Sequence, residues 1–505
     1  MTSSKKNQSF FPRWIALWVL FTVPMLAWAG QQAKKSTSTA PAAAPHPASP
    51  AQHPSQPVQH STVQPQHSTG QPQHSTGQQQ HSNTLPHASI DHPPTPSHPP
   101  APSKGPLTYQ SHPGEEKKSL PGGRTQYVAK NRTVTTDASG HVRKIETQTG
   151  MAGNKMTIAH TPGTGRQVVT GGPGSRVVSY GPKRGFVERP IAGRPGYISR
   201  TYVYGGRSYA VVYRQYGYRG FGYYGYVPAY YYGPGFYGWA VTPWYTPVPY
   251  YWGGPIVAPW FGFYAGYFVP YPVYASPDVW LTDYLLSENL RAAYENQQAE
   301  NNGAPAPDPA PTSANTPPTI TPEMKAMIAE EVRQQLAAEK ADAAQPTAAS
   351  SGQAAVDGDQ VPPALSQKFF VVSSSLDVTA GSQTCSLTPG DIIERRSKDV
   401  ASDGTVALEV ISSKKGDCAA DSAAPVQVQL ADLQEMHNQL RQQIDSGLKT
   451  LADNQAKGLP AAPATKVRTV AAGTTDPASD AATKVAAQES DAGNVEAGLR
   501  QTVTN

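Results

Sequence analysis

The stretch from Gly220 to Pro277 most constrains the fold of this 505-residue chain, because it contains no Lys, Arg, Asp or Glu. It is dense in Tyr, Trp, Phe and Gly, and prolines interrupt it at Pro228, Pro234, Pro243, Pro247, Pro249, Pro255, Pro259 and Pro270. Proline breaks helices, so a membrane-spanning helix is disfavoured despite the missing charge. The sequence predicts loops and extended pieces whose rings pack onto a neighbouring sheet. Exposed rings would instead form an adhesive patch.

Residues 124 to about 216, which precede this stretch, have the pattern of consecutive antiparallel strands. Short runs of β-branched and aromatic residues alternate there with glycine-bearing turns. The expected strands are 126–136, 141–148, 155–159, 167–170 and 176–180. We group residues 117–300 as one basic, β-rich and Tyr/Gly/Pro-rich region that a helix over 276–300 closes.

A hairpin is predicted where Gly205-Gly206 joins strands 197–204 and 207–216, because paired glycines supply the positive φ angles of a two-residue turn. Alternation along these strands lines up rings and guanidinium groups. Such a face can stack on sugars or pair with acidic groups, although cross-strand tyrosines also simply stabilise sheets. The candidate polymer-binding residues are Arg200, Arg207, Arg214, Tyr202, Tyr204, Tyr209 and Tyr213.

Two further helices carry apolar stripes that could contact a protein partner or pack internally. Linkers 301–320 and 344–365 flank the first, at 321–343, which starts at Thr321-Pro322-Glu323. The second runs over 432–451 and repeats Leu, Met and Ile on one face.

Residues 366–452 predict a small β domain followed by that second helix. Strands are expected at 369–372, 386–395, 406–411 and 426–430. The run Leu387-Thr388-Pro389-Gly390-Asp391-Ile392-Ile393 resembles the pattern of bacterial SH3-like barrels. That resemblance, over 366–430, implies a small β-barrel of a family that often binds cell-wall peptides or protein segments.

The only two cysteines, Cys385 and Cys418, both fall in this small domain. An even pair in a compact, exported domain predicts a structural disulfide rather than a metal site or a nucleophile.

Residues 30–116 are rich in Gln, His, Ser and Pro and poor in large apolar side chains, so they predict disorder. The tail 453–505 lacks periodicity and predicts disorder as well.

Within residues 30–116 a seven-residue repeat spaces His46, His53, His60, His67, His74 and His81. Imidazoles on a flexible chain could share a zinc, copper or nickel ion weakly, or could simply be tolerated in a linker.

The N-terminus predicts export. Residues 1–29 combine Lys5, Lys6 and Arg13 with an apolar run and Ala27-Trp28-Ala29, the pattern of a signal peptide cleaved after Ala29. A retained anchor is disfavoured because the apolar run is too short to span a bilayer. We therefore expect a periplasmic, cell-surface or extracellular protein with no transmembrane segment after cleavage.

Charge is segregated along the chain. Residues 117–219 hold 18 Lys and Arg against three acids, whereas residues 278–505 hold 17 against 30. The basic segment suggests an anionic partner, for which an envelope component or acidic polysaccharide suits an exported protein better than nucleic acid. Attraction between the two segments of the same chain is the alternative.

No catalytic motif is present, and acids are absent where rings are dense, so we expect neither enzyme activity nor a cofactor.

The fold class predicted is mainly β with long disordered segments: an antiparallel region with aromatic-rich packing, and a small SH3-like barrel followed by a helix. The order of segments resembles uncharacterised exported proteins of environmental Gram-negative bacteria with a Tyr/Gly/Pro-rich centre. The function hypothesis is a non-enzymatic envelope or surface protein that binds anionic or carbohydrate polymers. The alternative is a periplasmic metal-binding protein that uses the histidine repeat.

Overall fold

The structure is a computed structural model. It describes residues 107–120, 123–148, 155–161, 165–253, 258–300, 319–344, 359–381, 383–420, 424–453 and 456–501. Contacts divide the chain into Met1–Thr95 and Pro96–Asn505, and every described residue belongs to the second unit. The predicted signal peptide, the six repeat histidines and most of both linkers lie outside the described residues.

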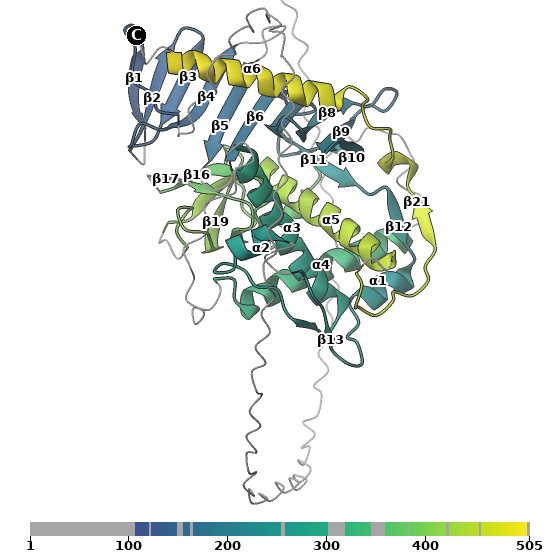
Figure 1. Ribbon diagram of the computed structural model, residues 1–505. Helices are drawn as coiled ribbons and strands as arrows, with labels where there is room; N and C mark the ends of the chain where they lie inside the picture. Colours follow the sequence, from purple (N-terminus) through teal and green to yellow (C-terminus); the bar gives the residue numbers. More distant parts are fainter. Residues whose placement is uncertain are drawn as a thin grey trace, which may run out of the picture. The chain divides into compact units, whose positions relative to one another are not determined.

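An antiparallel sheet of 11 strands in simple sequence order dominates the fold (Figure 1). Its strands are β1 (Glu116–Leu120), β2 (Arg124–Ala129), β3 (Arg132–Thr136), β4 (Val142–Gln148), β5 (Lys155–Thr161), β6 (Gly165–Gly172), β7 (Ser175–Gly181), β8 (Arg184–Pro190), β9 (Tyr197–Tyr204), β10 (Arg207–Tyr218) and β11 (Phe221–Val227). Each strand hydrogen-bonds the next one along the chain, which is why short glycine turns suffice as connections. The prediction of a mainly β protein with antiparallel strands is confirmed.

The Gly205-Gly206 hairpin forms as predicted. Both glycines have positive φ, 55° and 82°, and Arg207 pairs with Tyr204 directly across the turn. Two details upstream differ from the prediction. The run 126–136 is divided by a tight turn into β2 and β3, and β8 forms where no strand was expected.

The end of the tract predicted to be disordered is ordered, contrary to expectation. Leu107 and Tyr109 are buried, and Thr108 forms a β-bridge with His141. Glu116 already belongs to β1. The physical reason is that Leu107 and Tyr109 reach the apolar cluster formed by strands β3–β6.

The aromatic stretch forms short elements separated by loops. These are β12 (Tyr230–Tyr232), α1 (Pro234–Ala240), β13 (Val248–Pro249), α2 (Pro259–Phe263) and β14 (Val273–Tyr274). Many rings are buried, as expected, but most pack against helices rather than against the large sheet. Phe236, Tyr274 and Trp280, for example, share one cluster with Leu336 and Ile444.

Three long helices provide that packing: α3 (Pro277–Glu300), α4 (Pro322–Ala344) and α5 (Leu430–Ala452). All three lie within two residues of their predicted bounds. The apolar stripes of α4 and α5 are used internally, since Val332 and Leu336 meet Leu440, Ile444 and Leu448 in a single cluster.

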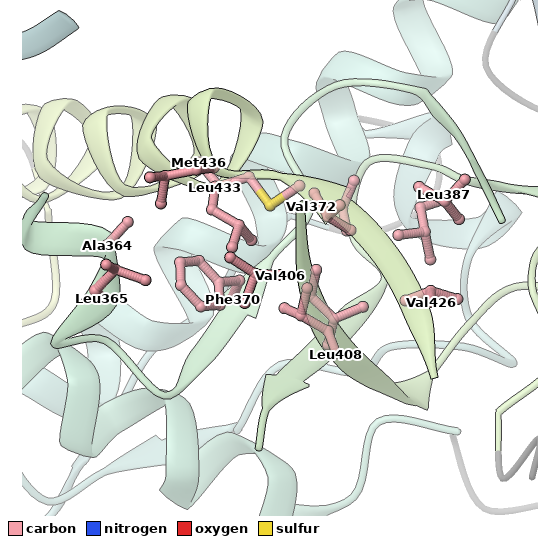
Figure 2. Packing of buried hydrophobic residues seen from close by; sticks show 14 of the residues in the cluster. Ala364, Leu365, Phe370, Val372, Leu387, Val406, Leu408, Val426, Leu433 and Met436 are labelled. Carbon is pink, nitrogen blue, oxygen red and sulfur yellow. The ribbon is translucent and has the colours of Figure 1, made fainter. Parts of the chain in front are cut away.

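The remaining strands form a second antiparallel sheet in the order β15-β18-β19-β20-β16-β17. They are β15 (Phe369–Val371), β16 (Leu376–Ala380), β17 (Gln383–Leu387), β18 (Ile392–Arg395), β19 (Thr405–Ser412) and β20 (Val426–Gln429), with a short 3-10 turn η3 (Pro363–Leu365) before them. Leu433 and Met436 of α5 cover its core, seen in Figure 2 with Phe370, Val406 and Leu408. The expected SH3-like barrel is wrong in one respect: β15 and β17 are the two edges of the sheet, and no described pairing closes it.

The tail predicted to be disordered is also largely ordered. It forms β21 (Val467–Thr469), which pairs with β12, then the short turn η4 (Ala471–Gly473) and the helix α6 (Ala481–Gln501). Figure 1 shows α6 crossing the strands of the large sheet, and its contacts are with β6–β9. The prediction failed because α6 buries only small or isolated apolar side chains, such as Ala481, Val485 and Leu499, and is otherwise held by ion pairs.

The predicted disulfide is confirmed, with the Cys385 and Cys418 sulfur atoms 2.10 Å apart. Among the helices of the described residues, none combines the length and apolar character needed to cross a membrane.

Candidate functional site

Six of the seven predicted polymer-binding residues share one face of the β9–β10 hairpin, but they meet different environments. Arg200 and Tyr213 are buried, so neither side chain is open to solvent in this structure. Arg214 lies on the opposite face, where its guanidinium rests over the rings of Tyr197 and Tyr216. Tyr204, Tyr209 and Arg207, near the turn, are exposed.

Arg200 is held inside a polar cage instead of facing solvent. Its Nη2 donates to Glu188 Oε1 at 2.7 Å, and its Nη1 donates to Tyr202 and Tyr213 and pairs with Glu435 of α5. Burial is the largest single influence and opposes the charge, but Glu435, Tyr202, Tyr213 and Glu188 together outweigh it, so the pKa of Arg200 is raised well above its usual value. Arg200 therefore fastens the large sheet to α5.

Other cations of the basic segment are likewise paired with acids from the C-terminal half. Arg166 pairs with Glu489 and Glu496 of α6, Arg189 with Asp480, and Arg184 with Glu295 of α3. Many arginines of the basic segment therefore form ion pairs with acids of the acidic C-terminal segment, as the alternative of attraction within the chain predicts. These paired arginines are less able to bind a separate anionic polymer.

A cleft of about 500 Å³ lies between the segment around α2 and one side of α3. We call it the aromatic cleft. It is lined by Tyr250, Trp252, Ala258, Pro259, Trp260, Trp280, Tyr284, Ser287, Glu288, Arg291, Tyr294, Glu295, Gln298 and Thr450. Its volume is within the range of small-molecule binding sites in proteins, which are typically lined by rings with a few polar groups.

The helix α3 supplies one continuous wall of the aromatic cleft. Most of the helix is buried, and five of its more exposed residues recur at intervals of three or four positions. These five are Tyr284, Glu288, Arg291, Glu295 and Gln298, and all of them line the cleft. Residues at such spacing share one helix face, so the stripe forms a single surface.

The rings of the cleft form a stacked platform. Trp252 stacks on Trp280 with centroids 5.7 Å apart, and Trp280 stacks on Tyr284 at 5.2 Å. Tyr250 meets both indoles edge-on. Offset stacks and edge contacts are the favoured arrangements of aromatic pairs, so the rings of the platform stabilise one another.

A buried hydrogen-bond chain fixes the outer indole of this platform. Trp252 Nε1 donates to Tyr274 Oη at 2.7 Å, and Tyr274 Oη donates to Asp283 Oδ2 at 2.6 Å. Lys325 of α4 completes the chain, with its Nζ 2.8 Å from Asp283 Oδ1. Burial raises the pKa of Asp283 and lowers that of Lys325 because it disfavours both charged forms, and the attraction between the two groups opposes each shift.

Charged side chains form a polar rim beside the rings. The Arg291 guanidinium donates to Glu288 Oε2 at 2.5 Å and lies 3.9 Å from Glu295, which also pairs with Arg184 of β8 at 2.9 Å. Tyr204, one of the predicted residues, hydrogen-bonds Glu295. Burial raises the pKa of Glu288, with Arg291 opposing the shift.

Sequence reasoning predicted none of the residues that line the aromatic cleft as a binding site; Tyr204, which hydrogen-bonds Glu295 at the rim, is the predicted residue that lies beside it. The stripe of α3 carried a readable signal, because Tyr284 and three charged residues recur on one face of the predicted helix. Tyr250, Trp252 and Trp260 carried none, since only the tertiary fold brings them to α3. Among the described residues no group of His, Cys, Asp and Glu is arranged to hold a metal ion.

No protein-family model matches this chain, and searches of curated proteins and of solved structures give no match either.

Proposed function

We propose that this protein is an exported, non-enzymatic envelope or surface protein that binds a carbohydrate polymer in the aromatic cleft. The observation that carries the proposal is the stacked platform of Trp252, Trp280 and Tyr284 beside a charged rim. Flat rings offer apolar contact to the flat faces of sugars, while carboxylates and guanidinium groups can hydrogen-bond hydroxyls.

Export is part of the proposal and has two supports. Residues 1–29 have the composition of a cleaved signal peptide. The Cys385–Cys418 pair lies at bonding distance, and disulfides persist in oxidising compartments. Mass spectrometry of protein purified from its native cell fraction should give an N-terminus at Gly30; an intact Met1 in the cytosol would remove this part.

A carbohydrate is favoured over a generally anionic polymer. Of the arginines predicted to bind acidic groups, Arg200 is buried in its cage, and others in the basic segment are paired with acids of the same chain. Trp252 and Tyr284 are half-buried beside the buried Trp280, and these partly accessible rings with balanced charge fit sugar hydroxyls better than phosphates or carboxylates.

The test compares Trp252→Ala with Tyr245→Ala in the mature chain, using sedimentation with insoluble polysaccharides and calorimetry with soluble oligosaccharides. Trp252 lines the cleft, whereas Tyr245 is an exposed aromatic residue outside it. Trp252→Ala should weaken binding by about tenfold or more, equivalent to about 1.4 kcal/mol, because a central ring contact is lost. Tyr245→Ala should bind like the wild type.

Folding and salt provide the controls. Trp252→Phe retains a ring and should have intermediate affinity, which separates loss of stacking from loss of the fold. Binding should change little between about 0.05 M and about 0.5 M salt, because stacking is not screened. Binding that survives Trp252→Ala and falls steeply with salt would instead indicate a polymer held by arginines.

A further inference from the structure

The charges of the aromatic cleft are already compensated within the protein. Arg291 is shared between Glu288 and Glu295, and Arg184 pairs with Glu295 as well. Among the described lining residues Arg291 is the only cation, and it faces two carboxylates. From this balance we infer that the ligand of the cleft is an extended, neutral glycan. The inference rests on the proposed function and names its substrate class.

An acidic sugar would meet an unfavourable field in this cleft. Binding a uronate carboxylate strongly requires a cation that is free to pair with it, usually in a bidentate geometry. Arg291 already donates to Glu288 and lies 3.9 Å from Glu295, so a uronate would be the third carboxylate around one guanidinium. The two carboxylates of the protein would repel it, because like charges at such short range disfavour one another. A neutral sugar avoids this cost, because its hydroxyls can donate to Glu288 and accept from Arg291 while the pair stays intact.

Ser287 provides a second, independent indication of a ligand. It lines the cleft between Tyr284 and Arg291, its side chain is 3% exposed, and its Oγ has no hydrogen-bond partner among the described residues. Buried hydroxyls are nearly always paired. The Oγ is closed to solvent in this structure, so a neutral polyol in the cleft supplies the donor and the acceptor that the hydroxyl lacks only after a local shift of the α3 wall.

The length of the α3 stripe indicates a polymer rather than a single ring. From Tyr284 to Gln298 the stripe extends over more than half of the helix, which corresponds to about 21 Å at the rise of an α-helix. Affinity should therefore rise with oligosaccharide length until the stripe is covered.

The experiment measures affinities of the mature chain for length-matched cello-oligosaccharides, N-acetylated chito-oligosaccharides, oligogalacturonates and de-acetylated chito-oligosaccharides. At least one neutral series should bind about tenfold or more tighter than both the acidic and the cationic series. Ser287→Ala should weaken binding of the neutral ligand by between about twofold and about tenfold, the range of one neutral hydrogen bond.

A structural role of Ser287 would give a different pattern. Removing an unpaired hydroxyl should leave the melting temperature unchanged or slightly raised, so lost affinity without lost stability supports a ligand contact. Ser199→Ala is the matched control, because Ser199 Oγ on β9 is also buried without a partner but lies outside the cleft. It should leave affinity unchanged.

The outcomes distinguish this inference from the proposed function. If no glycan of any series binds, the proposed function fails. If glycans bind in the cleft but an acidic or cationic series binds as tightly as the neutral ones, or Ser287→Ala binds like the wild type, the neutral-ligand inference alone is overturned.

Discussion

Several charged residues of this protein are buried where two helices or a helix and a sheet pack together. The pH dependence of the protein's stability therefore depends on the pKa values of these residues. The clearest case joins α4 to α5. Glu339 lies 3.8 Å from Arg441 and accepts a hydrogen bond from Gln335, while Asp445 accepts one from Tyr226 at 2.6 Å. Burial raises the pKa of Glu339 to about 8, with the Asp445 carboxylate adding to the shift, and burial raises the pKa of Asp445 to about 6.

The raised pKa of Glu339 fixes the sign of a pH dependence. In the unfolded chain this group titrates near 4.5, so between there and about 8 the folded state binds the proton more tightly. Its contribution to stability is complete below the unfolded value and is lost as the pH rises. Glu339→Gln should therefore lose less unfolding free energy than the wild type between about pH 5 and about pH 8, as measured by urea denaturation.

Other groups titrate over the same range, so the comparison needs a matched variant. Glu330→Gln alters a glutamate on the same helix that is largely exposed beside Arg333. It should keep the pH dependence of the wild type. Equal slopes for Glu339→Gln and the wild type would contradict the assignment.

At the scale of elements, close approach of α3 and α5 positions the aromatic cleft. A Cβ on Gly447 of α5 would lie 2.4 Å from Leu281 Cδ2 and 3.2 Å from Tyr284 Cδ1. Glycine inside a helix costs up to about 1 kcal/mol of helix stability relative to alanine. The sequence alone gives no reason for that cost at Gly447. The structure gives the reason for it: only glycine lets α5 approach the helix that carries the cleft wall.

Gly447→Ala should therefore destabilise the protein by about 1–3 kcal/mol despite the better helix propensity of alanine, because the added methyl overpacks the junction. Gly493→Ala on α6 is the control, since no atom lies within 4 Å of its added Cβ. That change should stabilise by about 0.5–1 kcal/mol. Chemical denaturation measures the free energy of unfolding of both variants, and a stabilising Gly447→Ala would refute the packing argument.

At the scale of the whole molecule, the large sheet and the six-stranded sheet share a core. Tyr218 and Tyr223, at the β10–β11 end of the large sheet, are buried in the same cluster as Phe370, Leu387 and Leu408. The sequence suggested a self-contained domain over 366–452, because local patterns of strands and turns carry no information about what covers them.

This shared core predicts that the Cys385–Cys418 bond stabilises the described unit as a whole. Its sequence separation of 33 residues corresponds to about 3–4 kcal/mol from restriction of the unfolded chain. Replacing both cysteines by alanine should lower the midpoint of one cooperative transition, followed by circular dichroism and by tryptophan fluorescence. Two separate transitions, of which only one responds to the replacement, would show that the six-stranded sheet unfolds independently.

What the sequence predicted well was local. The Gly205-Gly206 hairpin, the bounds of α3 and α4 and the cysteine pair all follow from spacing within a few residues or from a unique pairing. What it missed depends on distant partners. The order of α6 rests on Glu489 and Glu496 meeting Arg166, and the aromatic cleft rests on Trp252 meeting Trp280. In both cases the partners have no periodicity relative to one another.

The position of α6 also has a consequence for how the chain is made. A ribosome completes Val187 and Val203 long before Val485, the residue that packs beside them in one apolar cluster. Until α6 has been made, this part of the nascent chain has an uncovered apolar surface with which neighbouring chains can associate. A stop codon shortly before residue 481 would therefore leave a product prone to aggregate during biogenesis.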